Sequence, residues 1–553
     1  MVCAALWAVS AAAQNLTPSQ KEADFRFMVS LYNTYYAPLA WKKAAVSFDA
    51  LDIKPWIDKV AATTTDLDFY EVCVQYISSL NDSHAGFIIP SDFNASLGFG
   101  VDIYDGALLI DNINRTVLPS ALYPFGLSDE LVSIDGVDAQ EIASELAKYV
   151  PQGNPRASMR QGAARLTSRA QSRFPHAPDL PESATVVIKG QDGILEIYTI
   201  PWVKTGTPME AGPVPSPMGP GRTAVARLDP LEELQYSGVS RQDTDGVLGY
   251  GARNPVFLAG LPSTFARRLG ANAADFFYSG VFTVDDLKIG YLRIPHYAPP
   301  SQPMALAQFE AEIRFMNENT DGLVIDEMRN TGGNLCFGEN IAVRLHQDSF
   351  RVTGFELRAY YNRMLAFYNS WINAINTGMP AEAISQYELL YKEMLVANQA
   401  GAIVTKTLPL CTSSLTRKPV FDQNGVMLAY RKPIMVIIDD FSTSTADSFA
   451  AILQDSGRAL LYGMRTNGAG GNNISLSAGA YSETTVGMTI ALQVRPKMFA
   501  SPEFPATQYI ENVGVRPDVE NDYMTKENLL GNGAKFVDDF LQAMAAYIRG
   551  QTE

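Results

Sequence analysis

Histidine and cysteine are scarce in this chain, which has 553 residues and only four of each. Cys3 lies in an apolar N-terminal segment, and the other three cysteines, Cys73, Cys336 and Cys411, are far apart in the sequence. Such spacing excludes a disulfide-rich scaffold and a Cys-x-x-Cys metal site, although a single Cys336–Cys411 bridge stays possible. We therefore expect neither a metal ion nor an organic cofactor.

Clustered positive charge is missing as well. The chain carries 43 Lys and Arg against 59 Asp and Glu, a formal net charge of −16. Nucleic-acid recognition depends on clustered basic residues, so we expect no nucleic-acid partner. Beyond the N-terminus, no apolar run reaches the roughly 18 residues of a membrane-spanning helix. With 47% hydrophobic residues the composition is that of a globular protein, and the length allows about two to four domains.

The first residues, 1–16, are apolar as far as Ala13 and then become polar. The small residues Ala11, Ala12 and Ala13 before Gln14 are typical of the end of a secretory signal peptide, here without a positively charged start. This pattern predicts an exported protein, secreted or periplasmic. A ragged apolar N-terminus is the alternative.

Changes in composition and hydrophobic pattern divide the rest of the chain into five parts. Apolar residues at helical spacing predict an N-terminal helical region over 17–92. Residues 93–204 show short strands, a turn at Asp135-Gly136 and a helix over 138–149, and resemble a PDZ domain. Residues 205–285 begin rich in Pro and Gly and predict a linker or insertion. A core over 286–530 and a C-terminal helix within 531–553 complete the chain.

The core alternates apolar strands with amphipathic helices. We predict strands at 288–294, 321–327, 433–439 and 459–463, and helices at 303–318, 337–346 and 446–456. Continuous apolar strands between helices indicate a largely parallel α/β sheet covered on both faces. A long helical pattern over 355–400 interrupts this alternation.

Four hydroxyl residues, 442–445, fall between the strand at 433–439 and the following helix. This position lies at the carboxyl edge of a parallel sheet, where α/β proteins place their sites, and a helix N-terminus offers N–H groups to a developing oxyanion. Ser and Thr are also preferred helix caps, so a capping role explains the same residues.

A serine nucleophile needs a base, and four histidines are available. His176 lies in a Pro-rich loop, and His346 falls late in a helix, where a cationic side chain suits the C-terminus. His296 follows a predicted strand and is a reserve candidate. His84 directly follows Ser83 at a helix-to-strand junction. Separately, Gly332 and Gly333 follow a buried strand and would let backbone N–H groups approach a ligand, although a generic turn explains them equally.

Four segments in order resemble the S41 serine peptidases, the family of the C-terminal processing and tricorn proteases. They are LNDSHAGF at 80–87, DEMRNTGGN at 326–334, DDFSTSTADSFAAILQDSGRALLYGMRTNGAGG at 439–471 and YIENVGVRPDVE at 509–520. The resemblance implies a ClpP/crotonase-like peptidase core with a PDZ-like domain placed after the N-terminal helical region.

The resemblance also implies roles for individual residues. The nucleophile position falls on Ser444, and the lysine of the Ser-Lys branch is replaced by Ala469. Ser83-His84 and Glu511 instead match the tricorn-like branch, with His84 as base. Glu511 would hold the imidazole directly or through the Ser83 hydroxyl. Backbone N–H groups of Gly332 or Gly333 and of Thr445 would form the oxyanion hole.

These roles predict a serine peptidase that hydrolyses extended or C-terminal segments of a peptide or protein substrate through an acyl-enzyme. Two alternatives stay open. Some proteins that resemble this fold bind small hydrophobic ligands without proteolysis, and a peptidase-like enzyme of a biosynthetic pathway would have the same sequence features.

Overall fold

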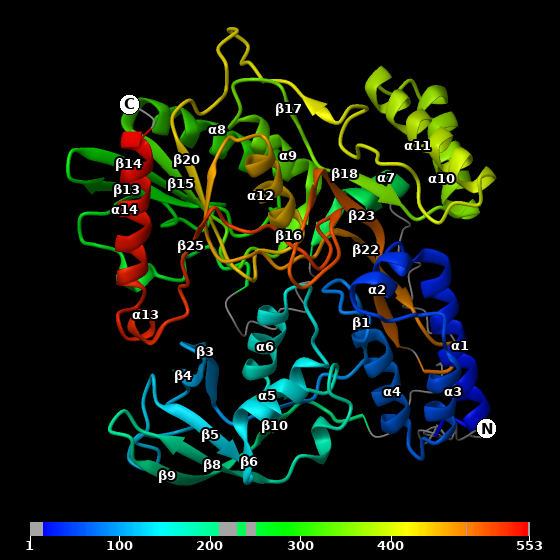
Figure 1. Cartoon of the computed structure of the whole chain (residues 1–553), viewed down its shortest axis with the longest axis vertical. Helices are drawn as coiled ribbons and strands as arrows, with labels where there is room; N and C mark the ends of the chain where they lie inside the picture. Colours follow the sequence, from blue (N-terminus) through cyan, green and yellow to red (C-terminus); the bar gives the residue numbers. More distant parts are fainter. Residues whose placement is uncertain (1–14, 210–228, 239–249, 483, 551–553) are drawn as a thin grey trace, which may run out of the picture.

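The computed structural model describes residues 15–209, 229–238, 250–482 and 484–550 (Figure 1). The predicted signal segment therefore lies almost wholly outside the described residues. The N-terminal region is helical, as α1 (Pro18–Tyr35), α2 (Leu39–Ala45), α3 (Lys54–Ala61) and α4 (Asp66–Ser78). Thr17 and Thr65 start α1 and α4 with capping boxes, in which side chains satisfy the first free N–H groups of each helix.

The PDZ-like region forms a separate lobe below the core in Figure 1. Its main sheet has the order β3-β4-β5-β8-β9, and β6 pairs with β5. These strands are β3 (Phe99–Tyr104), β4 (Ala107–Ile113), β5 (Glu130–Ile134), β6 (Val137–Asp138), β8 (Ser183–Lys189) and β9 (Leu195–Pro201). Asp135 and Gly136 both have positive φ, 51° and 82°, so the predicted turn joins β5 to β6 as a tight hairpin. A small sheet, β10-β2-β7, and helices α5 and α6 complete the lobe; their bounds are β2 (Asn94–Ser96), β7 (Ser168–Ala170), β10 (Val203–Thr205), α5 (Ala139–Ala147) and α6 (Pro155–Ala164).

The core is a mixed sheet of the order β12-β13-β14-β15-β20-β21-β25. Its strands are β12 (Ala266–Leu269), β13 (Tyr278–Val284), β14 (Leu287–Arg293), β15 (Gly322–Asp326), β20 (Ile434–Ile438), β21 (Leu460–Gly463) and β25 (Val519–Glu520). The pairs from β14 to β25 are parallel, as predicted, whereas β12 and β13 pair antiparallel at one edge.

Residues 266–284, within the stretch 205–285 that was predicted as a linker or insertion, include β12 and β13 of the core sheet. Residues 210–228, which are rich in Pro and Gly, and residues 239–249 lie outside the described part of the chain. The edge strand β12 consists largely of exposed residues, with two adjacent arginines. An edge strand of this kind has no continuous apolar pattern, which is the signal that identified the central strands.

Helices cover both faces of the core sheet. Alternate strand residues such as Leu323 and Ile325 pack against α8 (Gln302–Asn319), α9 (Leu335–Val343) and α12 (Thr445–Asp455). Val324 points to the opposite face, with the side chains of α14 (Ala534–Gly550), which crosses the sheet in Figure 1. This double cover explains why the central strands are apolar along their whole length.

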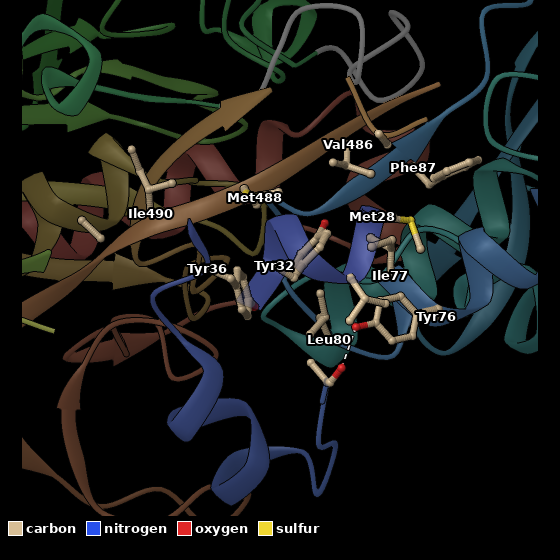
Figure 2. Close-up of a cluster of buried hydrophobic side chains, with 14 of the residues drawn as sticks. Met28, Tyr32, Tyr36, Tyr76, Ile77, Leu80, Phe87, Val486, Met488 and Ile490 are labelled. Atoms are coloured by element: carbon tan, nitrogen blue, oxygen red, sulfur yellow. Dashed lines mark hydrogen bonds between the residues drawn. The ribbon is translucent and has the colours of Figure 1, made fainter. Parts of the chain in front are cut away.

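A second sheet joins the N-terminal helices to the core. Its long strand β23 (Thr485–Phe499) pairs with β1 (Gly86–Ile88), β18 (Gly354–Leu357), β22 (Gly471–Ser477) and β24 (Thr507–Tyr509). Figure 2 shows side chains from α1, α4, β1 and β23 in one apolar cluster, with Met488 of β23 beside Tyr32 of α1. Because β1 begins two residues after His84, this cluster fixes the position of that histidine.

The predicted helical interruption is a hairpin of α10 (Tyr361–Asn376) and α11 (Ala381–Gln399), which projects from the core at the upper right of Figure 1. Cys411, in the chain that follows this hairpin, forms a disulfide with Cys336 in the first turn of α9. Among the described residues no helix has the length and apolar character to span a membrane.

Candidate active site

Ser444 occupies a sharp turn between β20 and α12. Its φ of 64° lies in a region that residues with a side chain rarely adopt, at a cost of about 1–3 kcal/mol. Asp447, in the first turn of α12, accepts the backbone N–H of Ser444 at 2.6 Å and that of Gly468 at 2.9 Å. The turn and the loop that contains Gly468 are therefore held by one buried carboxylate.

His84 reaches this turn from the other end of the chain. Its Nε2 lies 3.0 Å from the Oγ of Ser444, and both side chains are buried. The His84 backbone N–H donates to Asp82 Oδ1 at 2.8 Å, while Asp82 Oδ2 accepts from Tyr36 and Thr489, each at 2.8 Å. The structure thus brings together a hydroxyl, an imidazole and a buried carboxylate.

Ser83 makes its hydrogen bonds away from the imidazole. Its hydroxyl donates to Asn467 Oδ1 and accepts the N–H of Gly153 at 2.9 Å. A hydroxyl has a single proton to donate, so this arrangement does not form the expected link from Glu511 through Ser83 to His84. Ser83 instead joins the His84 turn to the loop after β21 and to the loop between α5 and α6 of the PDZ lobe.

Glu511 is buried on the far side of the His84 turn. Its Oε1 accepts from Lys42 Nζ, and its Oε2 accepts the N–H of Gly470 at 3.0 Å. Burial first, and then the charge of Asp82, raise the pKa of Glu511 to about 8, whereas Lys42 opposes this rise. Burial also acts against ionised Asp82, but Lys42 and His84 lower the pKa of Asp82 below its ordinary value. Asp82 is thus the carboxylate that is electrostatically coupled to His84.

The two candidate glycines differ in their contacts. The N–H of Gly332 donates to Asn330 Oδ1 at 2.8 Å. Gly333 has a φ of 140°, and a Cβ there would lie 2.5 Å from the backbone of Tyr297, so only glycine fits. The Thr445 hydroxyl donates to the carbonyl of Gly333 at 3.1 Å, which ties this loop to the helix that follows Ser444.

Strand β16 (Gly332–Asn334) contains both glycines and pairs antiparallel with β11 (Tyr236–Gly238), Ser237 lying opposite Gly333. An extended segment of the chain is therefore aligned along the glycine loop.

Arg160 links the PDZ lobe to the turn of Ser444. It lies on α6 and is buried, and it donates to Asp102 of β3 at 2.7 Å and to Asp440 at 2.7 Å. Asp440 lies four residues before Ser444, so an ion-paired network connects the two lobes next to the nucleophile turn.

Several of these residues were not predicted from the sequence. Asp82 lies within the LNDSHAGF segment, two residues before His84, and its spacing was a usable signal. Lys42 and Arg160 lie in segments without a motif, so the sequence offered no signal for them, whereas Asn467 lies in the segment 439–471 that carries the resemblance. Within the described ranges no group of three or more His, Cys, Asp or Glu residues could hold a metal ion.

Comparison with known proteins identifies both lobes. Residues 288–521 match peptidase family S41, and residues 93–208 match a PDZ domain. The chain contains an S41 peptidase domain. An S41 domain is a serine peptidase domain, so the protein is a hydrolase of the serine peptidase class. The S41 match includes Ser444 and Glu511, whereas His84 and Lys42 lie outside both matched ranges.

Curated relatives and solved structures match this chain over almost its full length. A protein of Chlamydia trachomatis serovar D is 24% identical over 561 residues, which cover 90% of this chain and 88% of the relative. A protein of Chlamydia pneumoniae is 23% identical over 595 residues and covers 94% of this chain and 89% of its own length. The crystal structure of mature CPAF has a TM-score of 0.74 at 21% identity, and the match covers 97% of this chain and 98% of CPAF. A structure of mature CPAF complexed with lactacystin gives the same TM-score and identity, with 96% and 99% covered. These structures establish a common fold.

Proposed function

We propose that the protein cleaves peptide bonds with Ser444 as nucleophile and His84 as general base. The observation that carries this proposal is the 3.0 Å separation of His84 Nε2 and Ser444 Oγ. His84 would take the Ser444 proton as the Oγ attacks the substrate carbonyl, and would return that proton to the leaving amine. Water would then hydrolyse the acyl-enzyme by the same proton transfers.

Asp82 and Glu511 support the proposed base. The imidazolium formed during attack gains a favourable interaction with the Asp82 carboxylate, which is already coupled to His84. We propose that Glu511 and Ser83 position the loops around His84, because their hydrogen bonds reach Gly470, Asn467 and Gly153. For the oxyanion we propose the N–H groups of Gly333 and Thr445, since the Gly332 N–H is engaged by Asn330.

We propose Ser-His rather than Ser-Lys chemistry. Position 469, where the Ser-Lys branch has its base, is a buried alanine whose N–H donates to Asp447 at 3.2 Å. Substrates would bind as extended chains along β16, in the antiparallel register that β11 adopts there. The PDZ lobe would guide a chain end toward the site.

We also propose that the protein acts after export. The Cys336–Cys411 disulfide supports this proposal, because such bonds persist in oxidising compartments. Free thiols at Cys336 and Cys411 in protein isolated from the native cell would contradict it.

The test of the peptidase proposal is incubation of the protein with a defined peptide library, read by mass spectrometry, beside Ser444→Ala. We expect cleavage products from the wild type that are absent with the variant. A fluorophosphonate probe should add one mass increment at Ser444 in the wild type only. Identical product patterns from the two proteins would contradict the assignment of the nucleophile.

A further inference from the structure

Lys42 is a buried cation beside the proposed catalytic residues. It lies on α2, its side chain is 1% exposed, and its Nζ donates to three oxygens: Glu511 Oε1, Asn512 Oδ1 at 2.7 Å and Asn81 O at 3.0 Å. An ammonium group has three protons, so each of them is engaged. Such a group has no lone pair and cannot act as the base for Ser444.

The three acceptors belong to the two loops that enclose His84. Asn81 precedes the Asp82–His84 turn, and Asn512 follows Glu511. Both asparagines have positive φ, 47° and 65°, and the Asn512 side chain donates to Asn81 O at 2.7 Å. Trp41, next to Lys42 on α2, donates from Nε1 to Asn512 Oδ1 at 3.1 Å. Helix α2 therefore fixes the Glu511 loop against the His84 turn.

The ionisable side chains at this junction are Lys42, Asp82 and Glu511. Asp82 and Glu511 are both fully buried, and Lys42 lowers the pKa of each. The other groups that face this pair are His84 itself, the hydroxyls of Tyr36 from the end of α1 and Thr489 from β23, and the N–H of Gly470. Without Lys42, burial and the charge of Asp82 would act on Glu511 unopposed by a cation, and the pKa of Glu511 would rise further.

We propose that Lys42 is a positioning residue for the peptidase reaction, which holds the Glu511 loop against the His84 turn through its three hydrogen bonds. This inference rests on the proposed function. It assigns a role to the N-terminal helical region, which neither matched range includes.

The experiment compares Lys42→Met, Lys42→Arg, Glu511→Gln and the Lys42→Met/Glu511→Gln double variant with the wild type. Lys43→Met is the matched control, because Lys43 is the next residue, is exposed and pairs with Asp49 at 2.7 Å. The readouts are the rate at which a fluorophosphonate labels Ser444, kcat and KM on a peptide from the library, and the pH dependence of both rates. Circular dichroism checks folding.

We expect Lys42→Met to slow labelling and kcat at least tenfold, with KM changed less than twofold. The midpoint of the rise in activity should move by one pH unit or more to higher pH, because Glu511 then ionises less readily. Lys42→Arg, which keeps the charge, should recover part of the rate. In the Glu511→Gln background, Lys42→Met should change the rate less than threefold, and Lys43→Met should match the wild type.

Wild-type rates and an unshifted pH midpoint in folded Lys42→Met would overturn the proposal. If Lys42→Met does not fold, the double variant provides the test, because it lacks both Lys42 and the Glu511 carboxyl group that Lys42 contacts. If the double variant is at least tenfold slower than Glu511→Gln, Lys42 does not act through Glu511 and the proposal is overturned. Equal rates for these two variants would support the proposal. The proposed function is tested separately, by the loss of labelling in Ser444→Ala. A failure of the proposed function can therefore be told apart from a failure of the Lys42 proposal.

Discussion

The imidazole of His84 lies 3.0 Å from the hydroxyl of Ser444, although the two residues are 360 positions apart in the sequence. Two separate sheets produce this contact. Ser444 follows the central strand β20 of the core sheet, whereas His84 is fixed by β1, which pairs with β23 of the second sheet. The site therefore forms only when the N-terminal helical region is packed against the core.

Ser444 and His84 should act as one unit in mutant kinetics. Ser444→Ala and His84→Gln should each lower kcat/KM by at least about 10³-fold, because removal of either group stops proton transfer from the nucleophile. The double variant should be no more than tenfold slower than the slower single variant. Peptide cleavage followed by mass spectrometry measures all three, and His176→Gln, at an exposed histidine, is the control. Losses that multiply in the double variant would contradict the Ser-His pair.

The Thr445 hydroxyl should matter for turnover more than for substrate binding. It donates to the Gly333 carbonyl at 3.1 Å and thereby orients the peptide unit next to the proposed oxyanion donor. Thr445→Val keeps the side-chain shape but removes the hydrogen bond, worth about 1 kcal/mol. We expect kcat to fall by about fivefold with KM nearly unchanged, and Thr445→Ser to retain most activity. Equal kcat values for the Val and Ser variants would remove Gly333 from the proposed oxyanion hole.

The disulfide between Cys336 and Cys411 should stabilise the protein measurably. It closes a loop across 75 positions, and removal of a native disulfide typically costs about 2–5 kcal/mol. We expect dithiothreitol to lower the thermal midpoint of the wild type and to have no effect on Cys336→Ala/Cys411→Ala. Non-reducing peptide mapping should recover the two cysteines in one fragment. Two free thiols in oxidised protein would show that the bond is not formed.

The central architecture of the core was predictable because its strands are apolar along their whole length. The predicted strand at 433–439 and helix at 446–456 differ from β20 and α12 by one residue at each end. Hydrophobic periodicity could not identify β12, because this edge strand is largely exposed. β13 is mostly buried, but it lies in the stretch that was assigned to a linker or insertion because its start is rich in Pro and Gly.

The candidate site was partly predictable for a different reason. Ser444, His84 and Glu511 stand in short segments that resemble a family, so their order in the chain identified them. Their partners depend on three-dimensional packing. Lys42 reaches Glu511 across 469 positions, and Ser83 reaches Asn467 across 384, and no local pattern encodes either contact. Asp82 was overlooked although its place two residues before His84 made it a candidate.

His346 should make stability depend on acid pH. The sequence suggested a cationic side chain at a helix end, but His346 is buried, stacks on Phe350 and bonds to Ala342 O and Ser456 Oγ, each at 2.8 Å. Burial, assisted by Arg458, lowers the pKa of His346 to about 4. Since the unfolded chain binds this proton near pH 6.5, the stability from neutral His346 is complete above pH 6.5 and is lost as the pH falls toward 4, by roughly 3 kcal/mol in all.

Buried carboxylates with raised pKa values, such as Asp439 and Asp447, change stability in the opposite direction over this range, so the comparison must be between variants. We expect urea unfolding of His346→Gln to vary less between pH 6.5 and 4 than that of the wild type, with His176→Gln as the control. The same pH dependence in His346→Gln and the wild type would show that His346 does not carry it.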